Sequence, residues 1–304
     1  MANSTLQSPL ALRIRQLISN PSVVIGGALV AIILFVAIFA PFLGTIDPNL
    51  NSTSTRLKPP GYEGMMKIYS DEGRIKVPVT YHMGSDNLGR DIYSRVVYGA
   101  RISLVVGVAV AAISIALGML IGLVAGYIRW LDGIIMRIMD GLMAIPAILL
   151  AIAVVSVFNA GMLSVIIAIV VPEVPRVVRL VRSIVLSIRE EPYVEAAITA
   201  GTGVPTLLVR HVLPNTIAPL IIQGTFIVAS AIIVEAILSF LGLGIPANEF
   251  PTWGNIMGVA RENFQLHPYQ IFFPGVILAV TVLAVNMLGD GLRDTLDPRF
   301  AKRV

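Results

Sequence analysis

Two carboxylates stand out because they lie in segments that are otherwise apolar. Glu235 interrupts an uncharged run that begins at Thr216, and Glu173 lies in a proline-flanked segment three residues before Arg176. An ionisable side chain in such a segment is costly and usually faces a cavity or a partner. The spacing of three residues allows Glu173 and Arg176 to form a helical ion pair. Both glutamates are therefore candidates to line a polar path. For Glu235 a structural role is favoured, whereas for Glu173 both interpretations stay open.

Patterns typical of catalytic sites are absent from the sequence. The chain has no Gly-Lys-Ser or Gly-Lys-Thr sequence of a phosphate-binding loop, no Gly-x-Ser-x-Gly elbow and no His-Glu-x-x-His pair. Its three histidines, His82, His211 and His267, are far apart, and it contains no cysteine. We therefore expect no metal site and no disulfide. An enzyme with a cofactor of its own is not expected.

A short polar segment between two apolar runs carries the strongest local signal. The sequence Glu-Glu-Pro-Tyr-Val-Glu-Ala-Ala-Ile-Thr-Ala-Gly at residues 190–201 predicts a helix that begins at Pro192 and ends before Gly201. Proline and acids favour the first turn, and glycine can adopt the left-handed conformation that ends a helix. A helix of about nine residues is not stable alone in water, so we expect a partner to dock on it. The face expected to meet that partner is small and flat: Tyr193, Ala196, Ala197 and Ala200.

The elements that position these residues are long apolar segments. Hydrophobic residues make up 56% of the 304-residue chain and charged residues 13%, with a mean hydropathy of +0.84. A soluble domain would carry about a quarter charged residues. Segments of about 20 apolar residues can cross a bilayer. The sequence therefore predicts an all-α integral membrane protein with about six transmembrane helices, at 23–42, 102–127, 142–158, 163–186, 216–244 and 271–288.

Basic residues are distributed unevenly along the chain. They gather in the tails and in the connections that include Arg129 and Arg189, whereas the connection 159–162 has none and 245–270 has only Arg261. The positive-inside rule then places both termini in the cytoplasm. The segment 44–101 is also rich in basic residues, but it is close to the length beyond which loop charge no longer sets orientation. The asymmetry accounts for the net charge of +4, so nucleic acid is not an expected partner.

These spans divide the chain into five expected parts, which are a cytoplasmic tail at 1–21, a first transmembrane helix at 22–43, an external loop at 44–101, a transmembrane core at 102–289 with the short helix 191–201, and a cytoplasmic tail at 290–304. The external loop is expected to contain a β-hairpin near 65–79. It is also expected to contain an amphipathic helix near 87–103 that lies on the membrane surface.

The second span contains a ridge of glycines at Gly118, Gly122 and Gly126. Small residues four positions apart allow a neighbouring helix to approach closely. Packing inside this chain is the favoured interpretation, and a seam between two subunits is the alternative. In the third span, Pro146 is expected to kink the helix.

Several motifs together resemble a known family. Glu195-Ala196-Ala197-x-x-x-Gly201, followed by Leu213-Pro214, resembles the cytoplasmic signature of permease subunits of binding-protein-dependent ABC importers. This chain has His211 where an aliphatic residue is usual, which is similar to the dipeptide, oligopeptide and nickel branch and its C-type permeases. Further similarity lies in 82–91, 98–101, 238–244 and 286–299.

The resemblance implies a type I ABC importer permease fold in which the short helix is a coupling helix against an ATPase subunit. The residues expected in that coupling are Tyr193, Glu195, Ala196, Ala197, Ala200, Gly201, His211, Leu213 and Pro214. A C-terminal cytoplasmic motif would lie beside the same ATPase: Gly289, Asp290, Arg293, Asp297 and Arg299.

The resemblance also implies partners and a location. A second, homologous permease subunit would complete the translocation path in the lipid bilayer of the inner membrane. Two ATP-binding subunits would use ATP and Mg, which this chain itself does not bind. A periplasmic or lipid-anchored substrate-binding protein would deliver the substrate, for which di- and oligopeptides are the favoured class. Two departures from the family bear on that substrate: the stretch 50–81 is longer than usual, and Pro-Glu-Val-Pro at 172–175 replaces a segment where an aromatic residue is common.

Two alternatives are weighed against peptide import. The same machinery could carry nickel, glutathione or opine-like compounds. A protein of another class, an ion-coupled secondary transporter, would show buried carboxylates and broken helices in matched halves. Here Glu235 has no counterpart in the first half, and the short helix would have no role, so the importer is favoured.

Overall fold

The structure, a computed structural model, describes residues 17–70 and 73–296 and is mostly helical. Its long helices are α2 (Pro21–Ile38), α3 (Ile92–Tyr127), α6 (Met162–Ile188), α9 (Leu213–Phe240) and α11 (Tyr269–Leu296). The shorter helices are α4 (Arg129–Met143), α5 (Ala147–Val155), α7 (Pro192–Thr199), α8 (Val204–Leu207) and α10 (Trp253–Ala260). A hairpin of β1 (Tyr62–Ser70) and β2 (Gly73–Tyr81) follows α2 in the chain.

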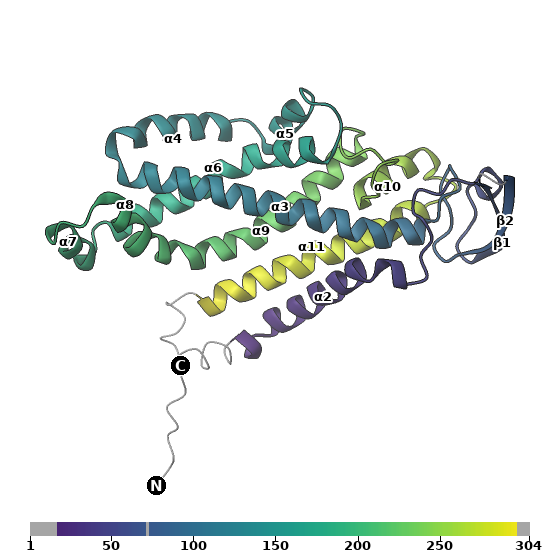
Figure 1. The fold of residues 1–304 in the computed structure, drawn as a ribbon, viewed down its shortest axis with the longest axis horizontal. Coiled ribbons are helices and arrows are strands. Elements are labelled where there is room, and N and C mark those ends of the chain that lie inside the picture. Colours follow the sequence, from purple (N-terminus) through teal and green to yellow (C-terminus); the bar gives the residue numbers. More distant parts are fainter. Residues whose placement is uncertain (1–16, 71–72, 297–304) are drawn as a thin grey trace, which may run out of the picture.

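The long helices form an elongated bundle with roughly parallel axes (Figure 1). α2 and α11 pack against each other along one side, α3 and α9 occupy the middle, and α6 with α4 and α5 covers the opposite side. The hairpin lies at one end of the bundle and α7 at the other. The two ends therefore present different surfaces, a polar cap with strands and a short exposed helix.

The described residues contain four helices that are long and apolar enough to cross a membrane, α2, α3, α8 together with α9, and α11. A fifth span results if α4 and α5 count as one, although these helices are bent by 90°. α6 is as long as the others, but every 18-residue window of it contains Glu173, Arg176 and Arg179. The protein is thus a multi-pass membrane protein in which α6 is the exceptional, charged helix.

The expected third span at 142–158 is wrong as a single kinked helix. Pro146 does not sit inside a helix but is the N-cap of α5, which has only nine residues. Pro146 cannot donate a backbone hydrogen bond, and proline disfavours helical geometry in the residue before it. The chain accordingly breaks between α4 and α5 rather than bending smoothly.

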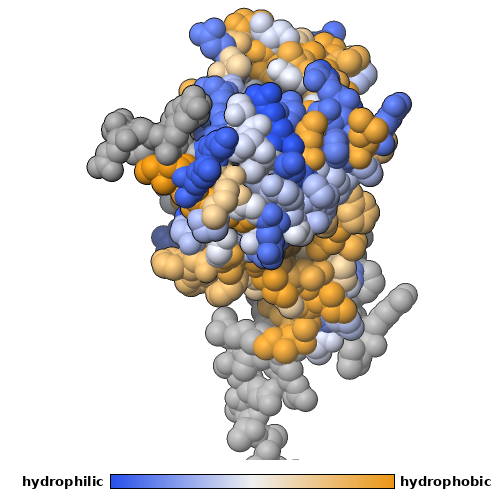
Figure 2. All heavy atoms as spheres, turned by 90° about the vertical axis from the view of Figure 1, so that its right-hand side faces the viewer, coloured by the Kyte–Doolittle hydropathy of each residue, from blue (hydrophilic) through white to orange (hydrophobic). Residues whose placement is uncertain are grey.

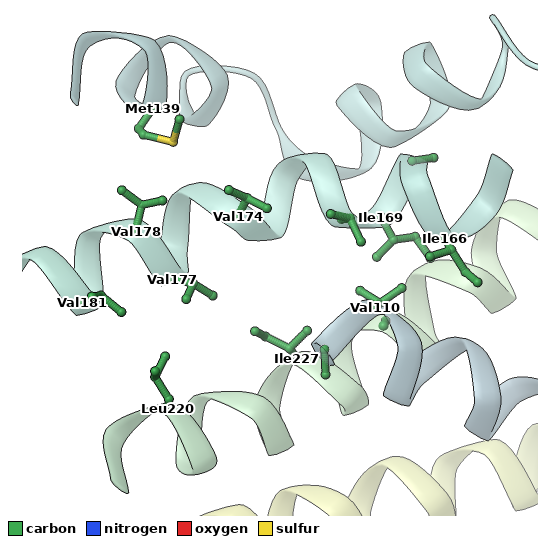
Figure 3. Close-up of a cluster of buried hydrophobic side chains, with 14 of the residues drawn as sticks. Val110, Met139, Ile166, Ile169, Val174, Val177, Val178, Val181, Leu220 and Ile227 are labelled. Carbon is green, nitrogen blue, oxygen red and sulfur yellow. The ribbon is translucent and has the colours of Figure 1, made fainter. Parts of the chain in front are cut away.

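The largest buried cluster lies where α3, α6 and α9 meet, and it is built from aliphatic side chains. Figure 3 shows Val177 and Val181 of α6, Val110 of α3 and Ile227 of α9 in this cluster, with Met139 reaching it from α4. The valines are β-branched and have few rotamers, which favours a well-defined packing.

The glycine ridge of α3 packs against α6 within this chain. A Cβ at Gly122 would lie 2.7 Å from Val181 Cβ, and one at Gly126 would lie 2.6 Å from Val185 Cβ. Gly118 faces Val177 in the same way. Successive glycines of α3 therefore contact successive valines of α6, with one helical turn between one contact and the next. The ridge is the internal seam between α3 and α6, and the alternative of a seam between subunits is not needed to explain it.

The hairpin end is held together by polar contacts between segments distant in sequence. β1 and β2 pair antiparallel, with Tyr62 opposite Tyr81 and Met66 opposite Val77, as expected from the alternating sequence. The Tyr269 hydroxyl of α11 donates to the Lys58 carbonyl at 2.8 Å. Figure 2 views this end directly and shows hydrophilic residues over its centre.

The amphipathic surface helix expected near 87–103 does not exist as a separate element. α3 begins at Ile92, where the Asp91 side chain accepts hydrogen bonds from the Tyr93 and Ser94 amides, and continues to Tyr127 without a break. Its apolar stripe, which includes Ile92 and Val96, is buried against Trp253 of α10 rather than in a lipid surface. Ile92, Val96 and Ala100 share a buried face as the apolar pattern predicts, but protein covers it, and Leu88, the first apolar position of the expected helix, lies before α3 and is exposed.

Candidate functional site

The candidate site is the end of the bundle formed by α7 and the segment that leads into α9. α7 follows the end of α6 closely and begins at Pro192, with Glu191 as its N-cap. Val194 is fully buried and joins the main cluster, and Ala197, one turn later, packs against that cluster half-buried. This inner face fixes α7 to its own chain.

Most of α7 outside this inner face is exposed, including the large side chain of Ile198. Tyr193 is 45% exposed, and Glu195, Ala196 and Ala200 are also exposed. Tyr193, Ala196 and Ala200 therefore form the free face, as expected. Ala197 was expected on this face, but the structure turns it toward the chain's own core, because it lies three residues after the anchor Val194.

Gly201 ends α7 in the manner predicted from its position. Its φ is +79°, the left-handed region, and its amide donates to the Ile198 carbonyl at 2.9 Å. The Thr202 amide donates to the Ala197 carbonyl at 3.0 Å. These two bonds satisfy carbonyls that the helix end would leave free. A side chain at Gly201 would meet no atom within 4 Å, so only its backbone conformation requires glycine.

The segment after α7 ties it to the next long helix. α8 continues into a π-helical turn, Leu208–Val212, which leads into α9 at Leu213. The Asn215 side chain in the first turn of α9 donates to the Tyr193 hydroxyl at 3.3 Å and to the His211 carbonyl at 2.8 Å. Pro214 is exposed, whereas His211 and Leu213 are half-buried. The Asn215–Tyr193 hydrogen bond thus links α7 to the start of α9.

The two candidate carboxylates are both buried within this chain. Glu235 is fully buried and accepts a hydrogen bond from the Ser239 hydroxyl at 2.7 Å. Its side chain is thus surrounded by atoms of this chain, and whether Glu235 also lines a path stays a prediction. Glu173 is 2% exposed, and its Oε1 accepts from Arg176 at 3.0 Å and from Ser230 of α9 at 3.1 Å. The expected Glu173–Arg176 ion pair is therefore present, with only its arginine reaching the surface.

The expected C-terminal motif is described only in part. Gly289, Asp290 and Arg293 belong to α11, which continues beyond the expected end of the last span, and the two charged residues are exposed. A Cβ at Gly289 would lie 3.2 Å from Thr225 Cβ of α9, so this glycine allows α9 and α11 to approach closely. Asp297 and Arg299 lie outside the described residues.

Sequence reasoning missed two buried arginines at the hairpin end. Arg90 and Arg95 each donate to the Ala247 carbonyl at 3.1 Å, and Arg95 also reaches the Pro48 carbonyl at 3.0 Å. Arg90 pairs with Asp86, whereas Arg95 is held by carbonyl and amide oxygens. These contacts fasten the loop after α9 to the start of α3. No spacing in the sequence predicts these two contacts, because Ala247 lies 157 residues after Arg90 and 152 residues after Arg95.

Two family models match the chain. Residues 99–302 match the model described as "binding-protein-dependent transport system inner membrane component", and residues 8–60 match the "N-terminal TM domain of oligopeptide transport permease C". The first match covers well over half of the chain. This chain belongs to the family of binding-protein-dependent transport permeases. The family is one of transporters of the inner membrane, so the alternative of an ion-coupled secondary transporter loses its support.

Curated relatives of this permease are similar over nearly the whole chain. A "probable peptide ABC transporter permease protein" of Sinorhizobium fredii is 46% identical over 93% of this chain and 91% of the relative. A "dipeptide transport system permease protein" of Alkalihalophilus pseudofirmus is 39% identical over 97% of this chain and 92% of the relative. The permease also resembles a chain of the inward-facing MetNI methionine ABC transporter, with a TM-score of 0.53 and 18% identity, over 67% of this chain and 97% of that one. This last likeness shows the shared fold.

Proposed function

We propose that this chain is the transmembrane permease subunit of an ATP-driven, binding-protein-dependent importer of di- or oligopeptides. It forms the translocation path together with a second, homologous permease. Two ATP-binding subunits bind and hydrolyse ATP with Mg, and a periplasmic or lipid-anchored binding protein delivers the peptide. Relatives named for peptide and dipeptide transport, similar over more than nine-tenths of this chain, support the substrate class. Nickel, glutathione or opine-like compounds are the alternative cargo.

The observation that carries the proposal is the construction of α7. Its inner face is anchored by Val194, while Tyr193 and Ala196 form a small exposed face at the end of the bundle. A helix of eight residues has little stability of its own, so its exposed backbone and flat face suit a protein groove. The hydrogen bond from Asn215 to Tyr193 supplies the link from that groove to a long helix. α7 therefore acts as the coupling helix.

The orientation follows from the charge pattern and from the two ends of the bundle. Arg189 and Arg210 flank the α7 end, which the positive-inside rule assigns to the cytoplasm together with both chain termini. The hairpin end then faces outward, where its hydrophilic surface meets the binding protein (Figure 2).

Matched variants of α7 test the coupling role. Ala196→Trp places a large side chain on the exposed face without touching the core, and Glu195→Lys inverts a charge in the first turns, where the helix dipole favours an acid. Gly201→Val forces a β-branched residue into the left-handed region. Gly203→Val is the control, because Gly203 has a φ of −66° and open space around it. We expect the first three variants to lose ATPase co-purification and transport, and Gly203→Val to retain both.

The assembled complex is the material for this test. The chain is co-expressed with the second permease and both ATP-binding subunits, and ATP hydrolysis is measured with the peptide-loaded binding protein. Normal membrane levels and normal pairing with the second permease exclude misfolding of each variant. Full ATPase binding by both Ala196→Trp and Gly201→Val would reject α7 as the coupling helix. Stimulation by nickel or glutathione but not by peptides would reject the peptide substrate while leaving the importer intact.

A further inference from the structure

Two ion pairs join α4 to α6, and a third lies within α6 beside them; all three arginines reach the surface at least in part. Arg179 of α6 donates to Asp140 of α4 at 2.6 Å, and the two side chains are 46% and 57% exposed. Arg182 of α6 forms a bidentate ion pair with Asp132 of α4. Within α6, Arg176, whose side chain is 46% exposed, pairs with Glu173 at 3.0 Å. α4 runs antiparallel to α6, since the earlier acid on α4 meets the later arginine on α6. The result is a row of three ion pairs, which we call the ion-pair face.

The depth of this face in the membrane follows from the glycine ridge. Val177 of α6 packs on Gly118 of α3, and Val181 packs on Gly122. Both glycines lie within residues 102–127, a stretch of α3 without any charged residue. Arg176 and Arg179 are neighbours of these valines in sequence and therefore lie at the same level. Ser230, which donates to Glu173, is likewise in the middle of α9. The ion-pair face begins at hydrocarbon depth.

Lipid is an unsuitable covering for such a face. Charged side chains at hydrocarbon depth are costly and normally face protein or a water-filled cavity. α4 extends the face with exposed Trp130, Ile134 and Ile138, but among them lies Arg137, exposed and without an ion-pair partner among the described residues. An arginine placed within an apolar stripe argues against burial of the stripe in lipid tails.

The opposite side of the bundle shows what a lipid-facing surface looks like in this chain. α2 contains no charged residue, and its exposed side chains are apolar, with large ones such as Ile32 and Phe35 among them. α2 and α11 lie along one side, and α4 lies along the other (Figure 1). The chain therefore has one side for lipid and one for water or for the rest of the assembly.

We propose that the ion-pair face of α4 and α6 is this subunit's wall of the water-filled translocation path, where it contacts the charged ends of a peptide substrate. The inference rests on the proposed function and names the residues of the path. On this wall, the Asp140 carboxylate can bind the ammonium group of a peptide, and the Arg179 guanidinium can bind a peptide carboxylate. Because Asp140 and Arg179 already pair with each other, a passing peptide exchanges one ion pair for another. Such a wall carries charged solutes without holding them tightly.

The absence of cysteine makes the chain a ready background for accessibility labelling. Ile138→Cys on α4 is compared with Ile32→Cys on α2, because the two isoleucines are 56% and 58% exposed and neither takes part in an ion pair. The complete complex in membranes, carrying no other accessible cysteine, is treated with a positively charged, water-soluble methanethiosulfonate. We expect Ile138→Cys to react at least about tenfold faster, because the thiolate forms in water and not in lipid. Modification of Ile138→Cys should also block transport.

Equal, slow labelling of both variants in a transporting complex would overturn the proposal in favour of lipid. Slow labelling of Ile138→Cys together with oxidative cross-linking to a cysteine in the second permease would overturn it in favour of a closed subunit seam. The labelling rate and the cross-linking do not depend on the identity of the substrate. A negative result for the water-filled wall can therefore be told apart from a failure of the proposed peptide transport. If the importer carries another cargo, the labelling result is unchanged.

Charge variants then test the contact with substrate. Asp140→Asn leaves Arg179 unpaired on the wall, and Arg179→Gln leaves Asp140 unpaired. We expect Asp140→Asn to lower the transport of a cationic peptide relative to an anionic one by about two- to fivefold, the range for an exposed ion pair, and Arg179→Gln to shift the ratio in the opposite direction. The double variant should restore the ratio. An unchanged ratio in both single variants would remove the substrate contact from the proposal.

Discussion

The seam between α3 and α6 allows a quantitative prediction at Gly122. In Gly122→Ala the new methyl group would lie 2.7 Å from Val181 Cβ and 2.9 Å from the Val178 carbonyl oxygen. One of these neighbours is backbone and the other is the base of a β-branched side chain. Neither can move aside by changing a rotamer, so the two helices must separate by several tenths of an ångström.

The magnitude combines two opposing effects. Alanine is favoured over glycine inside a helix by about 1 kcal/mol. Overpacking of a well-packed core costs about 1–3 kcal/mol. Gly133→Ala isolates the first effect, because Gly133 lies inside α4 and a methyl group there would have no atom within 4 Å. We expect Gly122→Ala to be less stable than Gly133→Ala by about 1–3 kcal/mol, which is the packing cost alone.

Reversible unfolding of the purified chain in mixed detergent micelles measures both free energies of unfolding. The chain is studied without the second permease, because the seam is internal. A double-mutant cycle adds Val181→Gly, which removes the Cβ that the new methyl group meets. Each single change should destabilise, and the pair should be more stable than their sum by about 0.5–3 kcal/mol.

Two results would refute this reasoning. Equal stability of Gly122→Ala and Gly133→Ala would show that the seam has free space. A loss seen only in the presence of the second permease would place the ridge between subunits, against the geometry described above.

The remaining predictions concern the outer end and the orientation. Burial raises the pKa of the Asp91 carboxyl above its usual range, against hydrogen bonds from Ser94, so folding does not favour the ionised form of this group over its neutral form. Asp91→Asn should therefore be nearly neutral in thermal unfolding, whereas Asp91→Ala should cost about 1–2 kcal/mol as a lost N-cap. Arg95→Ala should release the loop around Ala247, because buried carbonyl oxygens lose a charged hydrogen-bond donor. The expected results are faster limited proteolysis in this loop and a free energy of unfolding lower by about 2–5 kcal/mol. Lys67→Cys should react with an impermeant thiol reagent from outside and Thr206→Cys only after the cytoplasmic side is opened; the reverse would overturn the orientation.

Features set by local chemistry were predictable from the sequence. The hairpin follows from alternation in 62–81, and the end of α7 follows from Gly201. A close helix contact on α3 was predictable from glycines spaced by four residues. The sequence left open which helix would pack against these glycines. Local patterns identify an interface but not its occupant.

Features set by long-range contacts were not predictable. The stripe at the start of α3 has the pattern of a surface helix, and only the position of Trp253 shows that protein covers it. Ala197 is small enough for a docking face, but its register relative to Val194 turns it inward. The pairs of Asp140 with Arg179 and of Asp132 with Arg182 join residues 39 and 50 positions apart, and no local pattern specifies such contacts.

The length of α3 has a mechanical consequence. Its 36 residues span about 54 Å, whereas a hydrocarbon core is about 30 Å thick. α3 is clamped to α6 near its C-terminal end through the glycines and to the loop after α9, at the hairpin end, through Arg95 and Ala247. α6 in turn leads into α7 after three residues. If α3 tilts as a rigid rod by about 10°, its two ends move by about 5 Å in opposite directions, so we expect a push on α7 to displace the loop at the hairpin end the opposite way.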